Sequence, residues 1–319
     1  MCSLVNPTKL ALLVALMLSL SASRVCYATV ANFTQNTAIG LCSQAVLQVL
    51  KVGTNGTVTY VTSATQTTTT VRNLLPTFCN RRVAYPYLEP YLAVVGAGTE
   101  APLATMLASA TIRGNFIKAL VALVKTYPRC VGIMIDFSGL STSQATAYST
   151  FMAALLTAAQ ANSILLASAL PWDASRYADV YFNPTLPKLA FNVLRTFEDF
   201  FQSSTSIIHP LNPLFAMAAP FNNPANTIAL LFSTQFGVQT NNAGESITSS
   251  SSLTYVFNSF GAIDIKLNFA RTNSLGGVAL FSLNTAGANA ELLRYITSII
   301  APTPPTGYTY PVATAPTCG

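Results

Sequence analysis

The segment Cys130–Ser138 reads CVGIMIDFS and has the pattern of a strand that is buried on both faces. Its apolar residues follow one another almost without interruption, as in parallel sheets whose two faces are both covered. Asp136 and Ser138 stand at its carboxyl end, and the alternation of side chains along a strand points them the same way. Active sites of α/β barrels are built at the carboxyl ends of the strands. We therefore expect Asp136 and Ser138 to lie at a candidate site.

Apolar runs of this kind recur along the chain and alternate with longer amphipathic stretches, which indicates βα units around a parallel sheet. The runs are Arg24–Tyr27, Ala45–Val52, Tyr91–Val95, Val131–Phe137, Ile164–Leu170, Leu189–Leu194, Leu214–Ala219 and Gly277–Leu283. Helical spacing of apolar residues marks Arg113–Lys125, Ser141–Ala161 and Ala290–Ile300. Eight runs in 319 residues fit an α/β fold of one kind, the closed (β/α)8 TIM barrel.

Both ends of the chain differ from this barrel pattern. Residues 1–23 have a basic Lys9, an apolar stretch Leu10–Leu20 and small residues at Ser21–Ser23, which is the pattern of a secretory signal peptide. The apolar stretch is too short for a transmembrane helix, so we expect a secreted, extracellular protein without a membrane span. Residues 301–319 are rich in Pro and Thr and should form an extended tail unless Cys318 ties it down. The barrel is expected to comprise residues 24–300.

The low charge narrows the chemistry that the chain can perform. Hydrophobic residues make up 51% and charged residues 8%, with ten carboxylates and one histidine. The net charge of +6 is spread along the chain, so the basic patch of a nucleic-acid-binding protein is missing from the sequence. His209 has no partner at metal-ligand spacing and is expected to lie in a loop. Neither a metal nor a cofactor is expected, since no glycine-rich phosphate loop is found either.

Cysteines and glycosylation signals agree with secretion. Cys2 would leave with the signal peptide, and the simplest arrangement of the other five cysteines is two disulfides and one remaining thiol. Asn32 and Asn55 each begin an Asn-X-Thr triplet, so both are candidate N-glycosylation sites.

The segment Cys130–Ser138 resembles the strand signature D-G-x-D-x-D-W-E of the chitinases of glycoside hydrolase family 18. Further segments resemble this family in the expected order, and together they cover roughly residues 24–300. These segments are Val25–Tyr27, Leu41–Ser43, Asn55–Gly56, Leu92–Gly96, Leu103–Ser109, Asn192–Glu198 (M-T-Y-D in the family), Ala218–Phe221 and Gly276–Asn284. The resemblance implies the TIM barrel, and the gap from Pro220 to Gly276 leaves no room for the family's additional α+β insertion domain.

The resemblance also implies what the end of this strand does. Asp136 matches the acid that steers the substrate acetamide, Met134 replaces the acid that supports it, and Ser138 replaces the glutamate that protonates the leaving oxygen. A serine hydroxyl cannot act as this general acid, whose contribution is typically about 10²–10⁴-fold. We therefore expect a chitinase-like protein without an intact catalytic set. Asp136 is interpreted either as a buried structural carboxylate or as a group that contacts the sugar.

Other residues are placed in a sugar-binding cleft by the same resemblance. They are Tyr27, Trp172, Phe197, Glu198 and Phe281. Trp172 is interpreted either as a sugar platform or as a packing residue, and Tyr27 either as the floor of the cleft or as barrel filling. Phe281 stands where the family has a tryptophan, which predicts weak binding.

Three functions remain open beside this resemblance, and two disulfides are expected. Cys26–Cys42 is expected to pair as in the family, and Cys79–Cys130 is the second expected pair, which leaves Cys318 over. The chain is then a non-catalytic protein that binds chito-oligosaccharides, or an active chitinase with a displaced acid such as Glu198, or an interaction scaffold without sugar binding. Turnover and calorimetry with chitotetraose separate these alternatives.

Overall fold

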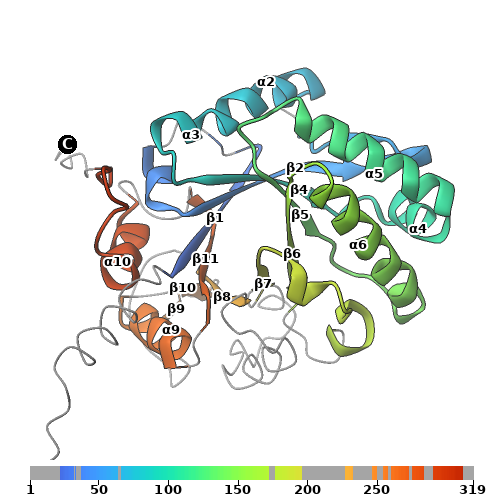
Figure 1. The fold of residues 1–319 in the computed structure, drawn as a ribbon. Helices are drawn as coiled ribbons and strands as arrows, with labels where there is room; N and C mark the ends of the chain where they lie inside the picture. The colour runs from blue at the N-terminus through green and yellow to red at the C-terminus, as the bar shows by residue number, and fades with distance from the viewer. Residues whose placement is uncertain are drawn as a thin grey trace, which may run out of the picture.

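Eight parallel strands form the centre of the computed structural model (Figure 1). The structure describes residues 22–31, 33, 37–63, 66–171, 177–195, 227–232, 246–249, 254–257, 260–272, 275–283 and 290–311. The eight strands are β1 (Ser23–Thr29), β2 (Gln44–Val52), β4 (Glu89–Val95), β5 (Gly132–Asp136), β6 (Leu165–Pro171), β7 (Asn192–Arg195), β8 (Thr227–Phe232) and β11 (Gly277–Phe281).

The strands close into a barrel. Their order is β1-β11-β8-β7-β6-β5-β4-β2, and β1 also pairs with β2, so the sheet returns to its first strand. Every neighbouring pair in this ring is parallel. The short strand β3 (Val58–Tyr60) adds to β2 in the antiparallel direction outside the ring. The predicted (β/α)8 TIM barrel is thereby confirmed.

Seven of the eight predicted apolar runs coincide with strands of the barrel. The remaining run, Leu214–Ala219, lies outside the described residues, and the place between β7 and β11 is held by β8 at Thr227–Phe232 instead. Both segments are short apolar runs, and periodicity alone does not distinguish between them. The seventh strand is therefore corrected to TIALLF at positions 227–232.

Helices cover the outside of the barrel (Figure 1). They are α2 (Thr68–Cys79), α3 (Arg81–Ala84), α4 (Glu100–Ala108), α5 (Ala110–Lys125), α6 (Ala145–Gln160), α9 (Phe260–Thr272) and α10 (Glu291–Ile300). Short helical turns are η1 (Thr37–Leu41), η2 (Thr54–Gly56), η3 (Thr142–Gln144), η4 (Tyr177–Tyr181) and η5 (Leu186–Lys188). The three predicted helical stretches coincide with α5, α6 and α10. A capping box between Ser141 and Gln144 starts the turn that leads into α6.

Side-chain alternation on β5 separates two apolar cores. Ile133 and Ile135 point outward into the layer between barrel and helices. Met134 points inward and joins the small core that fills the barrel, which includes Tyr27 and Tyr91. Asp136 has the same parity as Met134, so the barrel's own geometry directs its carboxylate to the inside.

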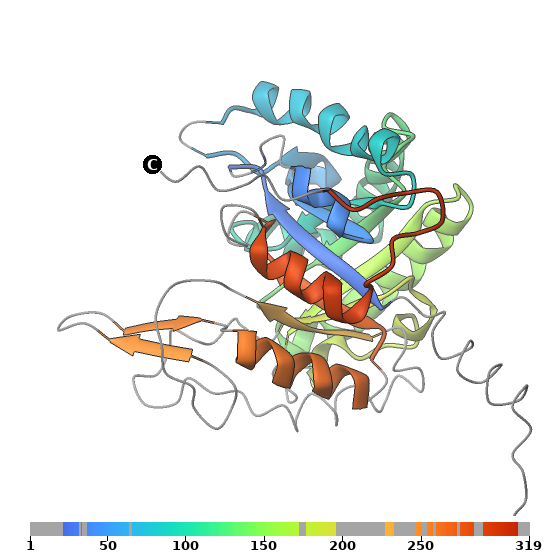
Figure 2. The same cartoon turned by 90° about the vertical axis from the view of Figure 1, so that its left-hand side faces the viewer.

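A two-stranded hairpin lies between β8 and α9 in the sequence. It consists of β9 (Ser246–Ser249) and β10 (Thr254–Phe257), which pair in the antiparallel direction. In Figure 2 the hairpin projects away from the barrel. Within the described part of the chain, no single helix is long and apolar enough to cross a membrane. Helices α4 and α5 have the required length and apolar composition only when they are taken together, and the two are bent by 111° relative to each other.

Two disulfides hold the amino-terminal half of the barrel. Cys26 pairs with Cys42 and Cys79 pairs with Cys130, which confirms both predicted bridges. The first joins β1 to the turn before β2, and the second joins the end of α2 to the segment before β5. Cys318, the predicted remaining thiol, lies outside the described residues.

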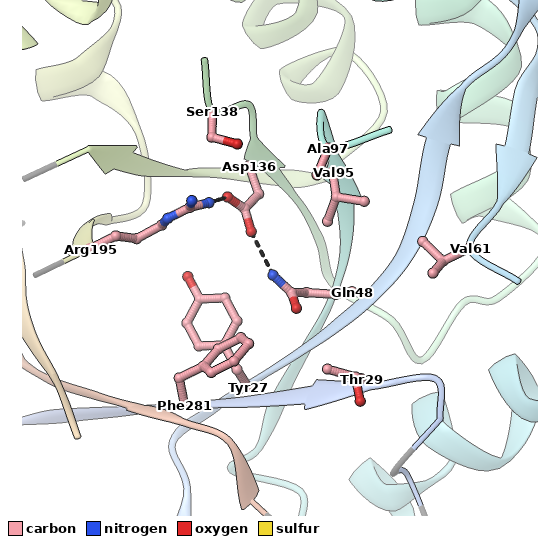
Figure 3. A pocket seen from close by; sticks show the side chains of 10 residues that line it. All are labelled: Tyr27, Thr29, Gln48, Val61, Val95, Ala97, Asp136, Ser138, Arg195 and Phe281. Atoms are coloured by element: carbon pink, nitrogen blue, oxygen red, sulfur yellow. Dashed lines mark hydrogen bonds and ion pairs between the residues drawn. The ribbon is translucent and has the colours of Figure 1, made fainter. Parts of the chain in front are cut away.

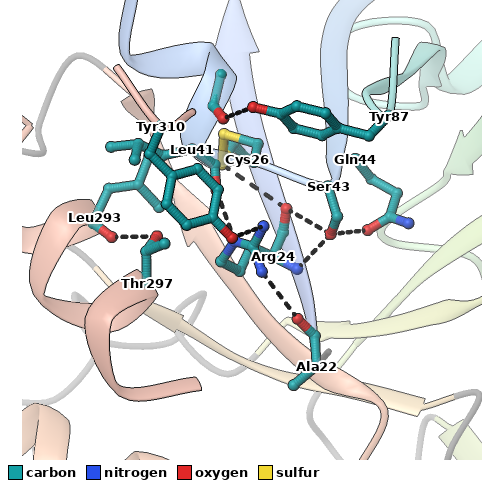
Figure 4. Close-up of a disulfide and its surroundings, with 12 residues drawn as sticks. Ala22, Arg24, Cys26, Leu41, Ser43, Gln44, Tyr87, Leu293, Thr297 and Tyr310 are labelled. Carbon is teal, nitrogen blue, oxygen red and sulfur yellow. Dashed lines mark hydrogen bonds between the residues drawn. A yellow bond between two sulfur atoms is a disulfide. The ribbon is translucent and has the colours of Figure 1, made fainter. Parts of the chain in front are cut away.

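The start of the tail is attached to the barrel beside the first disulfide (Figure 4). Arg24 is 3% exposed, and its Nε donates to the carbonyl oxygen of Leu41 at 2.6 Å. Its Nη2 donates to the hydroxyl of Tyr310 at 3.3 Å, and Tyr310 donates to the carbonyl oxygen of Ala301 at 2.9 Å. Burial lowers the pKa of Arg24. Tyr310 thus attaches the start of the predicted tail to the barrel through a contact that does not involve Cys318.

Candidate functional site

The carboxyl ends of the strands surround a pocket of about 310 Å³ (Figure 3). Ten residues line it: Tyr27, Thr29, Gln48, Val61, Val95, Ala97, Asp136, Ser138, Arg195 and Phe281. Thr29, Val95, Asp136, Arg195 and Phe281 are each the last residue of a barrel strand. The pocket therefore occupies the position at which α/β barrels carry their active sites.

Asp136 is the central polar group of this pocket and is 2% exposed. Its Oδ1 forms an ion pair with Nη1 of Arg195, which comes from β7. Its Oδ2 accepts a hydrogen bond of 2.7 Å from Nε2 of Gln48 on β2. A buried carboxylate is costly unless it is paired and hydrogen-bonded, and both oxygens of Asp136 meet this requirement.

Tyr27 and Met134 lie beneath Asp136 inside the barrel. The hydroxyl of Tyr27 donates to Sδ of Met134 at 3.1 Å, where the resemblance would place a supporting acid. Tyr27 is 1% exposed. Burial, and then the charge of Asp136, raise the pKa of Tyr27 well above its usual value, while Arg195 opposes this shift. Tyr27 therefore remains a protonated donor at neutral pH.

Phe281 and Ser138 form opposite parts of the pocket wall. Phe281 is half-buried, and its ring centroid lies 5.7 Å from that of Tyr27 at an interplanar angle of 51°. Ser138 is half-buried two residues beyond Asp136 and lines the pocket from the other side (Figure 3). The pocket thus combines the aromatic face of Phe281, the hydroxyl of Ser138 and the ion pair between Asp136 and Arg195.

The structure brings part of the predicted site together. Tyr27, Asp136, Ser138 and Phe281 all line one pocket, and Met134 lies directly below it. The remaining predicted cleft residues lie outside the described residues: Trp172, Phe197 and Glu198.

Sequence reasoning missed Gln48 and the role of Arg195. Arg195 was considered only as part of the segment that resembles M-T-Y-D. The sequence did hold a signal for Arg195. It is a cationic residue at the end of an apolar strand, two positions after the inward-facing Val193, so its side chain should also point into the barrel. Gln48 carries the analogous signal, since it is a polar residue two positions after the inward-facing Val46.

The pocket offers binding groups rather than an evident proton donor. Among its lining residues the only carboxylate is Asp136, and this carboxylate is engaged by Arg195 and Gln48. Ser138 contributes a hydroxyl, which is not acidic enough for general acid catalysis near neutral pH. Among the residues that the structure describes, no three His, Cys, Asp or Glu side chains are grouped to hold a metal ion.

This chain was compared with protein-family models, curated proteins and solved structures. Neither a protein-family model nor a curated protein matches the sequence. Solved structures do match, at low identity. A Group IV chitinase from Ostrinia furnacalis has a TM-score of 0.69 and 15% identity, over 88% of this chain and 100% of its own. A class V chitinase from Nicotiana tobaccum has a TM-score of 0.71 and 13% identity, over 88% and 99%.

A third similar structure is human YKL-39, described as a pseudo-chitinase with retained chitooligosaccharide binding properties. Its TM-score is 0.66 at 14% identity, and the match covers 86% of this chain and 98% of YKL-39. Identities of this size establish the fold alone. The chain has the (β/α)8 TIM-barrel fold of chitinases and chitinase-like proteins.

Proposed function

We propose that this chain is a secreted, non-catalytic chitinase-like protein that binds N-acetylglucosamine oligosaccharides in the pocket of Asp136, Ser138 and Phe281. The proposal combines the chitinase-like fold with the chemistry of this pocket. The observation that carries it is the ion pair between Asp136 and Arg195, beside a serine where a chitinase would hold its acid.

Two features of this pocket argue against hydrolysis, namely the serine at position 138 and the ion pair of Asp136 with Arg195. Substrate-assisted hydrolysis needs a proton donor at the leaving oxygen and a carboxylate that is free to orient the acetamide. Ser138 cannot supply the proton. Asp136 is held by Arg195 from β7 and Gln48 from β2, so both of its oxygens are already occupied. Because such groups act as a unit, retaining Asp136 alone does not sustain the reaction.

The shape of the pocket supports binding of a sugar. Its volume of about 310 Å³ is at the lower end of the range for small-molecule sites. Phe281 offers an aromatic face to the apolar side of a sugar ring, while Ser138 and Gln48 offer polar partners. The retained oligosaccharide binding of the pseudo-chitinase YKL-39 is a precedent on the same fold.

A turnover assay tests the first half of the proposal. Purified protein is incubated with fluorogenic chitobiose and chitotriose substrates, with an active chitinase as positive control. We expect no release above the buffer rate. Robust turnover would overturn the proposal, and loss of that turnover in a Glu198→Gln variant would then favour the displaced-acid alternative.

Calorimetry with chitotetraose tests the second half. We expect binding in the millimolar range or tighter, weakened at least about tenfold in Phe281→Ala, because aromatic anchors dominate such interfaces. Phe260→Ala is the matched control, since Phe260 is 53% exposed on α9 and does not line the pocket. Absence of binding at millimolar sugar would refute sugar binding and favour the scaffold alternative.

A further inference from the structure

A second hollow lies on the outside of the barrel, away from the pocket of Asp136. It is a shallow groove of about 610 Å³ between the turn after β2 and helix α5. One wall comes from Asn55, Gly56, Thr57, Val58 and Tyr60, and the other from Asn115, Ala119, Ala122, Leu123 and Thr126. It shares no lining residue with the first pocket.

The turn that forms one wall is pressed firmly against the helix. Gly56 has a φ of 77°, and a Cβ atom there would lie 2.3 Å from the carbonyl oxygen of Ile112. Only glycine fits both the left-handed conformation and this close approach. The position of Asn55, which precedes it, is therefore fixed relative to the groove.

The same turn carries the Asn55-Gly56-Thr57 triplet. Asn55 is exposed with a φ of 55°, so its side chain stands at the rim of the groove and not in the core. Thr57 is also exposed, and its hydroxyl donates to the carbonyl oxygen of Thr54 at 2.9 Å. In the other triplet, Asn32 and Thr34 lie outside the described residues.

We propose that Asn55 carries an N-linked glycan whose first sugar residues lie in the groove along α5. The glycan is transferred from a lipid pyrophosphate-linked oligosaccharide. The Asn55 amide nitrogen forms a bond to C1 of the first N-acetylglucosamine, the bond from C1 to the pyrophosphate oxygen breaks, and the amide proton leaves with the lipid pyrophosphate. The inference shares with the proposed function only the passage through the secretory pathway.

The composition of the groove suits such an occupant. Ala119 and Ala122 are small, so the helix surface leaves room for sugar rings beside the turn. Tyr60 is half-buried in the opposite wall and adds an aromatic face. Asn115 is exposed and has an amide that can both donate to and accept from an acetamide or hydroxyl group. A glycan attached at the rim therefore covers apolar surface that the bare chain leaves to water.

Glycopeptide mass spectrometry of protein secreted from eukaryotic cells tests the attachment. We expect a hexose- and N-acetylhexosamine-containing glycan on the peptide that includes Asn55, and its loss in Asn55→Gln and in Thr57→Ala. Asn73→Gln is the matched control, because Asn73 is exposed on α2 and begins no such triplet. An unmodified Asn55 in secreted wild-type protein would overturn the inference, whatever the sugar-binding experiments show.

The rate at which the glycan is released from the folded protein tests whether its first sugars lie in the groove. We expect a peptide:N-glycosidase to remove it at least about tenfold more slowly from native than from unfolded wild-type protein, a ratio equivalent to about 1.4 kcal/mol. Ala122→Leu should fill the groove and abolish this protection. Lys118→Leu places the same side chain on an exposed part of α5 that does not line the groove, and it should retain the protection. Equal release rates in native wild type and native Ala122→Leu would show that the glycan does not lie in the groove.

Discussion

Replacing Arg195 by methionine should destabilise the barrel far more than a surface substitution does. Arg195 is 9% exposed and its partner Asp136 is 2% exposed, so little water screens the pair. Removing one member of a buried pair leaves the other charge unpaired and typically costs about 3–5 kcal/mol. The hydrogen bond from Gln48, at 2.7 Å, remains and offsets part of this loss. We therefore expect Arg195→Met to lower the free energy of unfolding by about 3–4 kcal/mol.

A double-mutant cycle isolates the pair itself. Asp136→Asn should cost a similar amount, because it leaves Arg195 buried without its counter-charge. The double variant replaces both charges by neutral groups and should lie within about 1 kcal/mol of wild type. Arg72→Met on α2 is the matched control, since Arg72 is exposed, and it should change the free energy of unfolding by less than about 0.5 kcal/mol.

Equilibrium urea unfolding at pH 7, followed by far-ultraviolet circular dichroism, measures all four variants. If Arg195→Met alone does not accumulate as folded protein, recovery in the double variant provides the same evidence. The reasoning is refuted if each single variant costs less than about 1 kcal/mol and the two costs add in the double variant. In that case the ion pair would not hold Asp136, and its carboxylate would be available to orient a substrate acetamide.

Three further outcomes are expected. Ser138→Glu alone should not raise turnover of fluorogenic chitotriose above background, because the steering carboxylate stays paired; a gain of about 10²-fold or more would contradict this. Tyr310→Phe should cost about 1–3 kcal/mol in urea unfolding, since it removes the acceptor of Arg24, whereas Tyr308→Phe on the half-exposed neighbour should cost almost nothing. The pKa of Tyr27 is raised in the folded state, so the unfolded chain loses the hydroxyl proton first as the pH passes 10. The stabilisation that comes from the protonated Tyr27 is therefore complete below pH 10 and is lost above it. Stability measured between pH 9 and 11 should therefore fall less steeply in Tyr27→Phe than in wild type, by up to about 1.4 kcal/mol per pH unit; identical slopes would show that Tyr27 ionises in the folded barrel.

Much of the fold could be predicted because buried parallel strands are continuous apolar runs. Residues 132–136 show this most clearly, since every residue of β5 is buried. The seventh strand was the exception, because two apolar runs compete between β7 and α9. Local pattern gives no preference between 214–219 and 227–232, and only pairing with β7 and β11 selects the second.

The site could be predicted only in part because its key contacts join distant segments. Asp136 and Ser138 follow from their position at the end of a strand. The partner Arg195 lies 59 positions from Asp136, and Gln48 lies 88 positions away. Nothing local in either segment indicates a partner in the other, and the contact exists only once the barrel is closed.

The contact between Arg24 and Tyr310 has a consequence for the order of folding. The two residues are 286 positions apart, so on the ribosome Arg24 emerges long before its partner has been translated. Until then the guanidinium at the start of β1 lacks the ring and hydroxyl that cover it in the finished molecule. A nascent chain that lacks Tyr310 should hold its first strand less firmly, and loss of exchange protection at β1 in stalled chains would reveal this. The contact between Arg24 and Tyr310 can therefore form only after the whole barrel has been translated.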